Sequence, residues 1–303
     1  MLFVYARPLH TEQTIEALAK NKLAKESKLY IFADAAKHQG KEADVHAVRQ
    51  YIESIEERQW FAEVTIIKSS TNKGLANSVI SGVTQIINVY GQAIVVEDDL
   101  VTSPDFLLYM NQALAYYRSN KTIWSISGYS PKIAIPKEVT SDIYIVRRGC
   151  SWGWGTWKDR WEMTDWLAQD YRKFKYNPFR RVGLNRGGAD MASMLDDQMR
   201  GKIDSWAIRW CYSQYKHDMY TVYPVQSRLK NIGVDGSGTH QGVGHVFDTD
   251  IYDTEIPIHF EHVHLNKKIV KEFRKKFDSR LGVLMKAAVR KINKVFIRGD
   301  GIV

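Results

Sequence analysis

Cysteine is scarce in this chain of 303 residues, which contains only Cys150 and Cys211. Neither lies near a second cysteine at metal-binding spacing, and two cysteines cannot form the disulfide framework of a small secreted domain. No run of about 18 apolar residues is present, so we expect no helix that spans a membrane. The first residues, Met1 to Ala6, lack the basic segment and long apolar core of a signal peptide. These absences favour a reducing, cytoplasmic location.

An excess of positive charge is also missing from most of the chain, although the formal net charge is +9. Residues 267–298 contain twelve Lys and Arg but only two acids, so the net charge of all the other residues together is just below zero. A basic body that binds nucleic acid is therefore not indicated. With 44% apolar and 25% charged residues, the chain has the composition of a globular protein.

The basic segment near the end of the chain has the pattern of an amphipathic helix. Val270, Phe273, Phe277 and Leu281 recur at spacings of three and four, with Lys and Arg on the opposite face. Such a helix is typical of proteins that lie on an anionic membrane surface, here the inner face of the membrane. The alternative is a helix docked on the body with a solvated outer face. In both cases residues 266–303 form a basic amphipathic helical tail.

Strand and helix patterns alternate over the first 120 residues. Apolar strand segments at 2–7, 28–34, 64–67 and 93–96 are separated by amphipathic helix patterns at 12–25, 41–58 and 75–90. A further helix is expected with Ser103 as its N-cap and Pro104 at its first position. Strands that are apolar on both faces predict a Rossmann-like α/β fold, a mostly parallel sheet flanked by helices. Ligands of such sheets bind at the carboxyl ends of the strands.

The pattern changes after residue 120. Strands are expected at 123–127 and 143–146, followed by a Gly- and Trp-rich segment at 150–157 and one helix over 190–216. We therefore divide the body into two halves of one domain, residues 1–120 and residues 121–265.

Three acids, Glu97, Asp98 and Asp99, close the fourth apolar strand. Three like charges at a strand end are costly to desolvate unless a cation or hydrogen-bond donors meet them. The alternative is a solvated loop that caps the next helix, but Ser103 already supplies that cap. Carboxylates at the carboxyl end of a parallel sheet suit Mn²⁺ or Mg²⁺, with the oxygens of a diphosphate completing the shell.

A family resemblance begins at this acidic stretch. The string EDDLVTSPDFLLYM, which starts at Glu97, resembles the metal-binding stretch of GT-A glycosyltransferases, in particular of the N-acetylglucosaminyltransferase I family. Further features agree in order, namely YARP from residue 5, Asp34, NKGL from residue 72, SWGWG from residue 151 and DSW from residue 204. Bacterial proteins of glycosyltransferase family 2 type show a similar Trp-Gly-Trp-Gly loop and a similar Asn-Ile-Gly…Thr-His string, here at 231–240. The resemblance covers residues 1–245.

The resemblance implies that residues 1–120 bind a nucleotide-sugar and that 121–265 bind the acceptor. Asp99 resembles the direct metal ligand, Asp98 a residue that faces ribose and sugar, and Glu97 one that faces the donor sugar. His240 lies in a Gly-rich loop that can approach a ligand closely, and the acidic motif needs further ligands. We expect His240 to bind the metal or the diphosphate, with a flexible loop as the alternative.

Other residues of the first half resemble donor-binding positions. Arg7 and Asp34 resemble residues around the nucleotide base, although a salt bridge and a turn cap would explain them equally well. The residues that resemble those near ribose and diphosphate are Asn72, Lys73 and Gly74.

Glycosyl transfer with inversion needs one carboxylate to accept the proton of the acceptor hydroxyl. Asp204 matches the family's Asp-x-Trp catalytic motif, and Asp197 is the second choice. Trp206 follows Asp204 and offers a face for a sugar ring. Trp152 and Trp154 lie in the segment that resembles the family's acceptor loop.

The sequence thus predicts an inverting, metal-dependent glycosyltransferase. The expected donor is a UDP-sugar, and the expected acceptor is a saccharide or a lipid-linked saccharide, as in surface polysaccharide biosynthesis. One alternative is a metal-dependent nucleotidyltransferase or phosphohydrolase on a similar sheet. Another is a non-catalytic carbohydrate-binding protein that keeps the fold and the Trp-rich surface.

Overall fold

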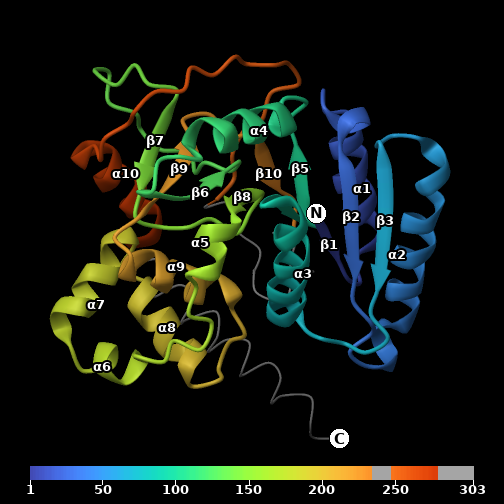
Figure 1. The fold of residues 1–303 in the computed structure, drawn as a ribbon, viewed down its shortest axis with the longest axis horizontal. Coiled ribbons are helices and arrows are strands. Elements are labelled where there is room, and N and C mark those ends of the chain that lie inside the picture. The colour runs from blue at the N-terminus through green and yellow to red at the C-terminus, as the bar shows by residue number, and fades with distance from the viewer. Residues whose placement is uncertain (234–246, 279–303) are drawn as a thin grey trace, which may run out of the picture.

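The computed structural model describes residues 1–233 and 247–278, which form an α/β fold. Its main sheet has eight strands in the order β3-β2-β1-β4-β8-β6-β9-β7 (Figure 1). The strands of this sheet are β1 (Leu2–Val4), β2 (Lys28–Ala33), β3 (Glu63–Lys68), β4 (Gln92–Glu97), β6 (Ile123–Ser127), β7 (Ile143–Val146), β8 (Trp154–Trp157) and β9 (Tyr220–Pro224). β5 (Leu100–Thr102) and β10 (Leu229–Asn231) form a separate antiparallel pair.

Helices cover both faces of the sheet. They are α1 (Pro8–Ala19), α2 (Glu42–Ser54), α3 (Leu75–Tyr90), α4 (Phe106–Tyr117), α5 (Lys158–Glu162), α6 (Tyr171–Lys175), α7 (Pro178–Leu184), α8 (Met191–Met199), α9 (Trp206–Lys216) and α10 (Lys267–Asp278). Successive side chains of a strand point to opposite faces. Leu2 and Val4 of β1 accordingly join the core of α1, α2 and α4, while Phe3 joins that of α3 and the tryptophans.

The expected mostly parallel sheet flanked by helices is confirmed. β1 to β4 are mutually parallel, as the apolar strand segments predict. β8 pairs antiparallel with β4 on one side and with β6 on the other. The sheet therefore continues across residue 120, and one core cluster contains residues from both halves.

Several predicted helix boundaries are wrong. The helix expected over 12–25 is α1, which begins at Pro8 and ends at Ala19, and the one expected over 41–58 ends at Ser54. The single helix expected over 190–216 is divided into α8 and α9, because Gly201 adopts a φ of +67° and Ser205 caps a new helix by accepting from the Ile208 amide. Ser103 does not cap α4, which begins at Phe106. Its hydroxyl instead donates to the Asp105 carboxylate at 2.6 Å, and the backbone turns once more before the helix.

The described part of the tail is docked on the body. Ile269 and Phe273 of α10 are 2% and 1% exposed, and Phe273 packs edge-on against Tyr144 of β7 and Tyr223 of β9. The membrane-facing position expected for Phe273 is therefore wrong, and the docked helix given as the alternative describes α10, because its apolar face covers the sheet. Leu281 lies outside the described residues. No helix in the described part of the chain is long and apolar enough to cross a bilayer.

Candidate functional site

The acidic stretch lies where β4 ends, next to the end of β1. Phe3 of β1 is in register with Glu97, and the chain after β1 carries Arg7 back towards the acids. Arg7 Nη1 donates to Asp99 Oδ2 at 3.0 Å, and its Nη2 donates to Asp98 Oδ1. Arg7 therefore forms the ion pair that the sequence left as an alternative. It supplies one positive charge to a group of three acids.

The acids are largely removed from water. Asp98 and Asp99 are 4% and 8% exposed, and the Tyr5 amide donates to the second oxygen of Asp98 at 3.2 Å. Burial opposes the charge of Arg7, but the attraction of the two aspartates outweighs it and raises the pKa of the guanidinium. The pKa of Glu97 is raised to about 8, first by burial and then by repulsion from Asp99 and Asp98. One guanidinium thus compensates the acidic stretch only in part.

One carboxylate oxygen at this strand end is available to a ligand. Asp99 Oδ1 is buried and accepts no hydrogen bond from any described residue. A buried carboxylate oxygen without a donor is unfavourable unless a cation meets it. Residues 1–233 and 247–278 contain no ready-made group of three or more His, Cys, Asp or Glu ligands. Mg²⁺ and Mn²⁺ need only one or two carboxylates when substrate phosphates complete the shell, so Asp99 fits such an ion.

The second half of the chain reaches the acids through Gly233. The amide of Ile232 donates to the Asp99 carbonyl at 2.8 Å, which continues the pairing of β10 with β5. A Cβ on Gly233 would lie 2.3 Å from Asp99 Oδ2 and 2.7 Å from Arg7 Nη1. Only glycine therefore fits against this ion pair. His240, the expected further metal ligand, lies outside the described residues.

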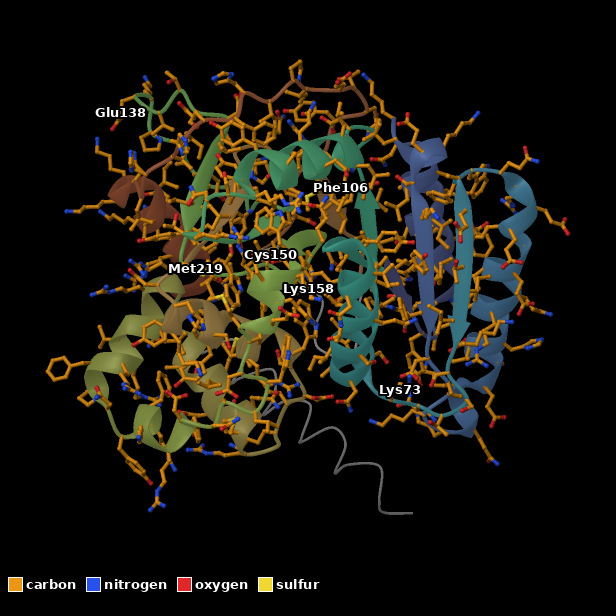
Figure 2. All side chains as sticks on the ribbon, viewed as in Figure 1. Lys73, Phe106, Glu138, Cys150, Lys158 and Met219 are labelled. Carbon is orange, nitrogen blue, oxygen red and sulfur yellow. The ribbon has the colours of Figure 1, made fainter. Side chains whose placement is uncertain are left out.

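Asp34 organises the loop that precedes α3. Its two carboxylate oxygens accept hydrogen bonds from the amides of Ala35, Lys73 and Gly74 at 2.9–3.1 Å. Asn72 donates to the Ala35 carbonyl at 2.6 Å. Gly74, the residue before the first residue of α3, adopts a φ of +75°. Asp34 is therefore a positioning residue for this loop. Figure 2 shows Lys73 at the end of the molecule where β2 and β3 finish.

Arg49 is a part of this loop system that the sequence reasoning missed. Its Nη2 donates to the carbonyls of Asp34 and Ser69 at 3.3 and 2.7 Å, which ties together the ends of β2 and β3. An arginine within an amphipathic helix pattern carries no sequence signal for such a role.

Asp204 lies beside the same loop, although 130 residues separate them in the sequence. Its Oδ2 is 3.6 Å from the position that a Cβ on Gly74 would take. The side chain is 59% exposed, and its other oxygen is 3.6 Å from Arg209 Nη2. Asp196, by contrast, accepts two hydrogen bonds from Arg181 at 3.0 and 2.8 Å. Asp204 therefore retains a solvent-facing carboxylate next to the donor-side loop.

Two of the three tryptophans that were expected to bind the acceptor are buried. Trp154 and Trp206 are 0% and 2% exposed and lie in a cluster with Trp161 and Trp210, so neither can offer a ring face to a sugar. The expected stacking role of these two residues is wrong, because their rings form the core between α3, β8 and α9. Trp152 alone of the predicted three is partly exposed.

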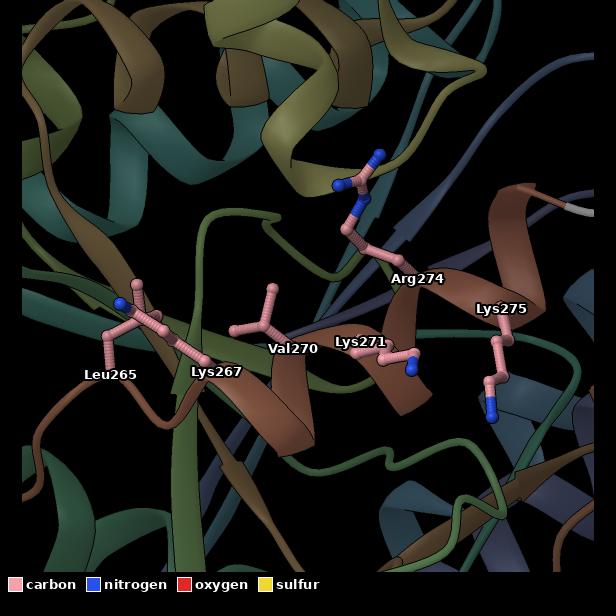
Figure 3. A pocket seen from close by; sticks show the side chains of 6 residues that line it. All are labelled: Leu265, Lys267, Val270, Lys271, Arg274 and Lys275. Atoms are coloured by element: carbon pink, nitrogen blue, oxygen red, sulfur yellow. The ribbon is translucent and has the colours of Figure 1, made fainter.

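Two surface pockets lie away from the acids. One of about 350 Å³ is formed by α10 and is lined by Leu265, Lys267, Val270, Lys271, Arg274 and Lys275 (Figure 3). Another of about 500 Å³ lies beside α2, with Glu42, His46 and Arg49 among its lining residues. The second adjoins the end of β2, so only this one is close to the loop held by Asp34.

Comparison with known proteins gives weak likenesses. No family model matches the chain, and no curated protein matches it. Among solved structures it is similar to S. aureus TarS 1-349, at 9% identity over 75% of this chain, with a TM-score of 0.41. The same protein in complex with UDP-GlcNAc gives 10% identity over 75% of this chain and a TM-score of 0.39. The chain covers 58% and 56% of those two chains.

A UDP-glucose pyrophosphorylase complexed with UDP-glucose is also similar, at 14% identity and a TM-score of 0.29, over 55% of this chain and 78% of that one. With identities and TM-scores this low, the likenesses identify no activity.

Proposed function

We propose that this protein is an inverting, metal-dependent glycosyltransferase of the GT-A class that uses a nucleotide-sugar, with UDP as the nucleotide. The main support for the proposal is that the Asp204 carboxylate lies next to the loop held by Asp34. The acidic stretch ends at the same end of the sheet. Trp206, two residues after Asp204, packs against Trp154 of β8, which is in register with Val95, two residues before Glu97. Carboxylates from both halves of the chain thus converge at one end of the sheet.

The two halves have separate roles in this proposal. Residues 1–120 bind the nucleotide-sugar, with the Asn72–Gly74 loop near ribose and diphosphate and with Asp98 and Glu97 near the sugar. Residues 121–265 bind the saccharide acceptor and contain Asp204, with Trp152 as the remaining aromatic contact. Asp99, and His240 with it, would hold Mn²⁺ or Mg²⁺, which supplies positive charge to stabilise the departing diphosphate.

Asp204 has the environment of a general base. Its carboxylate faces solvent, where an acceptor hydroxyl can reach it, and Arg209 lies beside it to fix its orientation. In this role Asp204 accepts the hydroxyl proton as the acceptor oxygen attacks the sugar. The buried Trp206 that follows it anchors the start of α9 and so holds Asp204 in place.

Donor binding is tested by thermal shift and calorimetry with UDP-sugars, with and without Mn²⁺. The wild-type protein should be stabilised only when both are present, and Asp99→Asn should lose this effect because a charged ligand is removed. Glu63→Gln, which changes an exposed acid at the start of β3, at the opposite end of this strand from the loop, serves as the control. An equal response of Asp99→Asn and wild type would refute the metal assignment.

The products distinguish the proposed reaction from its main rival. A glycosyltransferase releases free UDP from UDP-sugar when an acceptor is present. A nucleotidyltransferase would instead form or consume pyrophosphate, and a binding protein would release nothing. Chromatography of the nucleotides after incubation with Mn²⁺ decides among the three.

A further inference from the structure

The segment from α6 to the turn after α7 is a basic projection with exposed apolar side chains. Residues 171–186 contain six Lys and Arg and no Asp or Glu. Tyr176, Phe179 and Val182 are 73%, 86% and 65% exposed, which is unusual for side chains of this size. The exposed basic residues among them are Arg172, Lys173, Arg180 and Arg186. We call residues 171–186 the basic projection.

The basic projection is firmly anchored, so its exposed side chains are presented by a folded element. Phe174 and Leu184 are 0% and 1% exposed and pack into the core of α8 and α9. Arg181 forms a two-point ion pair with Asp196 of α8. Asn177 caps α7 by accepting from the Arg180 amide, and Pro178 stands at the first position of the helix. A rigid turn therefore displays Phe179 at the start of α7.

The charges around this turn are mostly uncompensated. Among the described residues, Arg172, Lys173 and Arg186 have no ion-pair partner, whereas Arg180 pairs with Asp170 at 3.3 Å. Phe179 and Val182 are three residues apart on one face of α7, and Arg186 lies in the short 3₁₀ helix that follows it, Asn185–Gly187. Aromatic and aliphatic side chains flanked by cations are typical of elements that enter the headgroup region of an anionic bilayer.

From these observations we infer that the basic projection is a membrane-contact site, which binds an anionic bilayer through its Lys and Arg and inserts Phe179. A second copy of the chain does not fit this surface, since two such surfaces would repel each other. α10 is a poorer candidate because its apolar face is buried against β7 and β9. The bound surface would have the chemistry of acidic phospholipid headgroups.

The position of the basic projection has a consequence for the choice of acceptor, and this consequence rests on the proposed function. Figure 1 shows α6 and α7 towards the same end of the molecule as the loop between β3 and α3. The basic projection belongs to the half assigned to the acceptor and contacts α8 and α9. A bilayer bound here would lie on the acceptor side of the site, so the acceptor class would be a lipid-linked saccharide.

Vesicle flotation of the full chain tests the site. We expect the protein to float with phosphatidylcholine vesicles that contain phosphatidylglycerol and to stay behind with phosphatidylcholine alone. Arg172→Gln/Lys173→Gln/Arg186→Gln should weaken binding on the order of a hundredfold, since each cation near such a surface contributes about 1 kcal/mol. Phe179→Ser should remove the part of the binding that resists salt, because charge interactions alone are screened within about 8–10 Å.

Two variants with changes elsewhere on the surface serve as matched controls. Val89→Ser changes a side chain on α3 that is 70% exposed, and it should leave flotation unchanged. Lys267→Gln/Lys271→Gln/Lys275→Gln removes three exposed charges from α10 and should also have little effect. Unfolding curves of all variants should coincide with wild type, as expected for exposed positions.

Two outcomes would overturn the inference. In one, the wild-type protein fails to float with anionic vesicles at low salt. In the other, the α10 variant loses binding while the variants of the basic projection keep it. Flotation needs no turnover, so vesicle binding without any UDP release would leave this site standing and refute the proposed function instead.

Discussion

Asp204 combines two properties that a general base requires at the residue scale, an accessible carboxylate and a fixed position. It follows a turn made by Gly201 and precedes the buried Trp206, which restricts the start of α9. Asp197, the alternative, is 3.5 Å from Lys202 and belongs to α8. The contact of Asp204 with the loop at Gly74 favours it over Asp197.

Replacing this carboxylate gives the first prediction. Asp204→Asn should reduce turnover by about two to four orders of magnitude, the usual effect of losing a general base. Binding of UDP-sugar with Mn²⁺ should persist, because Asp99 and the Asn72–Gly74 loop are unchanged. Steady-state kinetics and calorimetry measure the two quantities. If Asp197→Asn loses turnover while Asp204→Asn keeps it, the base is Asp197.

Cys211 provides a pH-dependent prediction about the interior. Its side chain is 6% exposed, and burial raises the pKa of the thiol to about 11, above its usual value. At pH 8 about one molecule in a thousand then carries the thiolate, the reactive form. In a Cys150→Ser background, labelling by a disulfide reagent should be slow at pH 8 and should accelerate as the pH rises.

Unfolding in urea should release that protection, and this serves as the control. Rapid labelling of the native protein at pH 8 would show that Cys211 is not buried in the core that α8 and α9 share.

At the scale of elements, α10 shows why an amphipathic pattern does not identify its partner. The same apolar face could meet lipid or protein. In the structure Phe273 contacts Tyr144 and Tyr223, with ring centroids 6.2 and 5.2 Å away. Side chains of the edge strand β7 and of β9 are thereby covered.

Phe273→Ala should lower the free energy of unfolding by about 3–5 kcal/mol, as for other large-to-small changes of fully buried aromatic residues. Lys271→Ala, two residues away on the exposed face, should change it by about 0.5 kcal/mol or less. Urea denaturation of both variants measures the contrast. Equal stabilities would mean that α10 does not dock on the sheet.

At the scale of the whole molecule, the two halves share one sheet and one core. β4 of the first half pairs with β8 of the second, and residues such as Ile31 and Val222 belong to the same core cluster. β10 of the second half reaches the acidic stretch by pairing with β5. The site is therefore assembled by contacts between segments more than a hundred residues apart.

This shared core predicts a single cooperative unfolding transition for residues 1–265. Far-UV circular dichroism and tryptophan fluorescence should give coincident curves, and the calorimetric enthalpy should equal the van't Hoff enthalpy. Fluorescence reports mainly on the tryptophan cluster around β8 and α9, whereas circular dichroism reports on both halves. Separate midpoints for the two probes would show that the halves unfold independently.

Local patterns determined much of this fold in advance. Strands apolar on both faces require cover on both sides, which predicts the parallel arrangement of β1 to β4 without any tertiary information. The acids at the end of β4 were identifiable because three adjacent carboxylates after a buried strand are costly without a compensating cation. The position of Asp34 at the end of β2 followed from the apolar strand pattern over residues 28–34.

Tertiary structure alone decided which partner each of these groups meets. Arg7 could have faced a ligand, but the fold returns it to Asp98 and Asp99. Trp154 looks like a surface aromatic in a Gly-rich loop, yet β8 inserts between β4 and β6 and buries it. Trp206 at the start of α9 packs against its ring and is buried with it. A sequence pattern indicates whether a side chain will be buried or will require a polar or charged neighbour. Many different residues of the fold can provide that environment. The choice among them depends on long-range strand pairing, which no local pattern encodes.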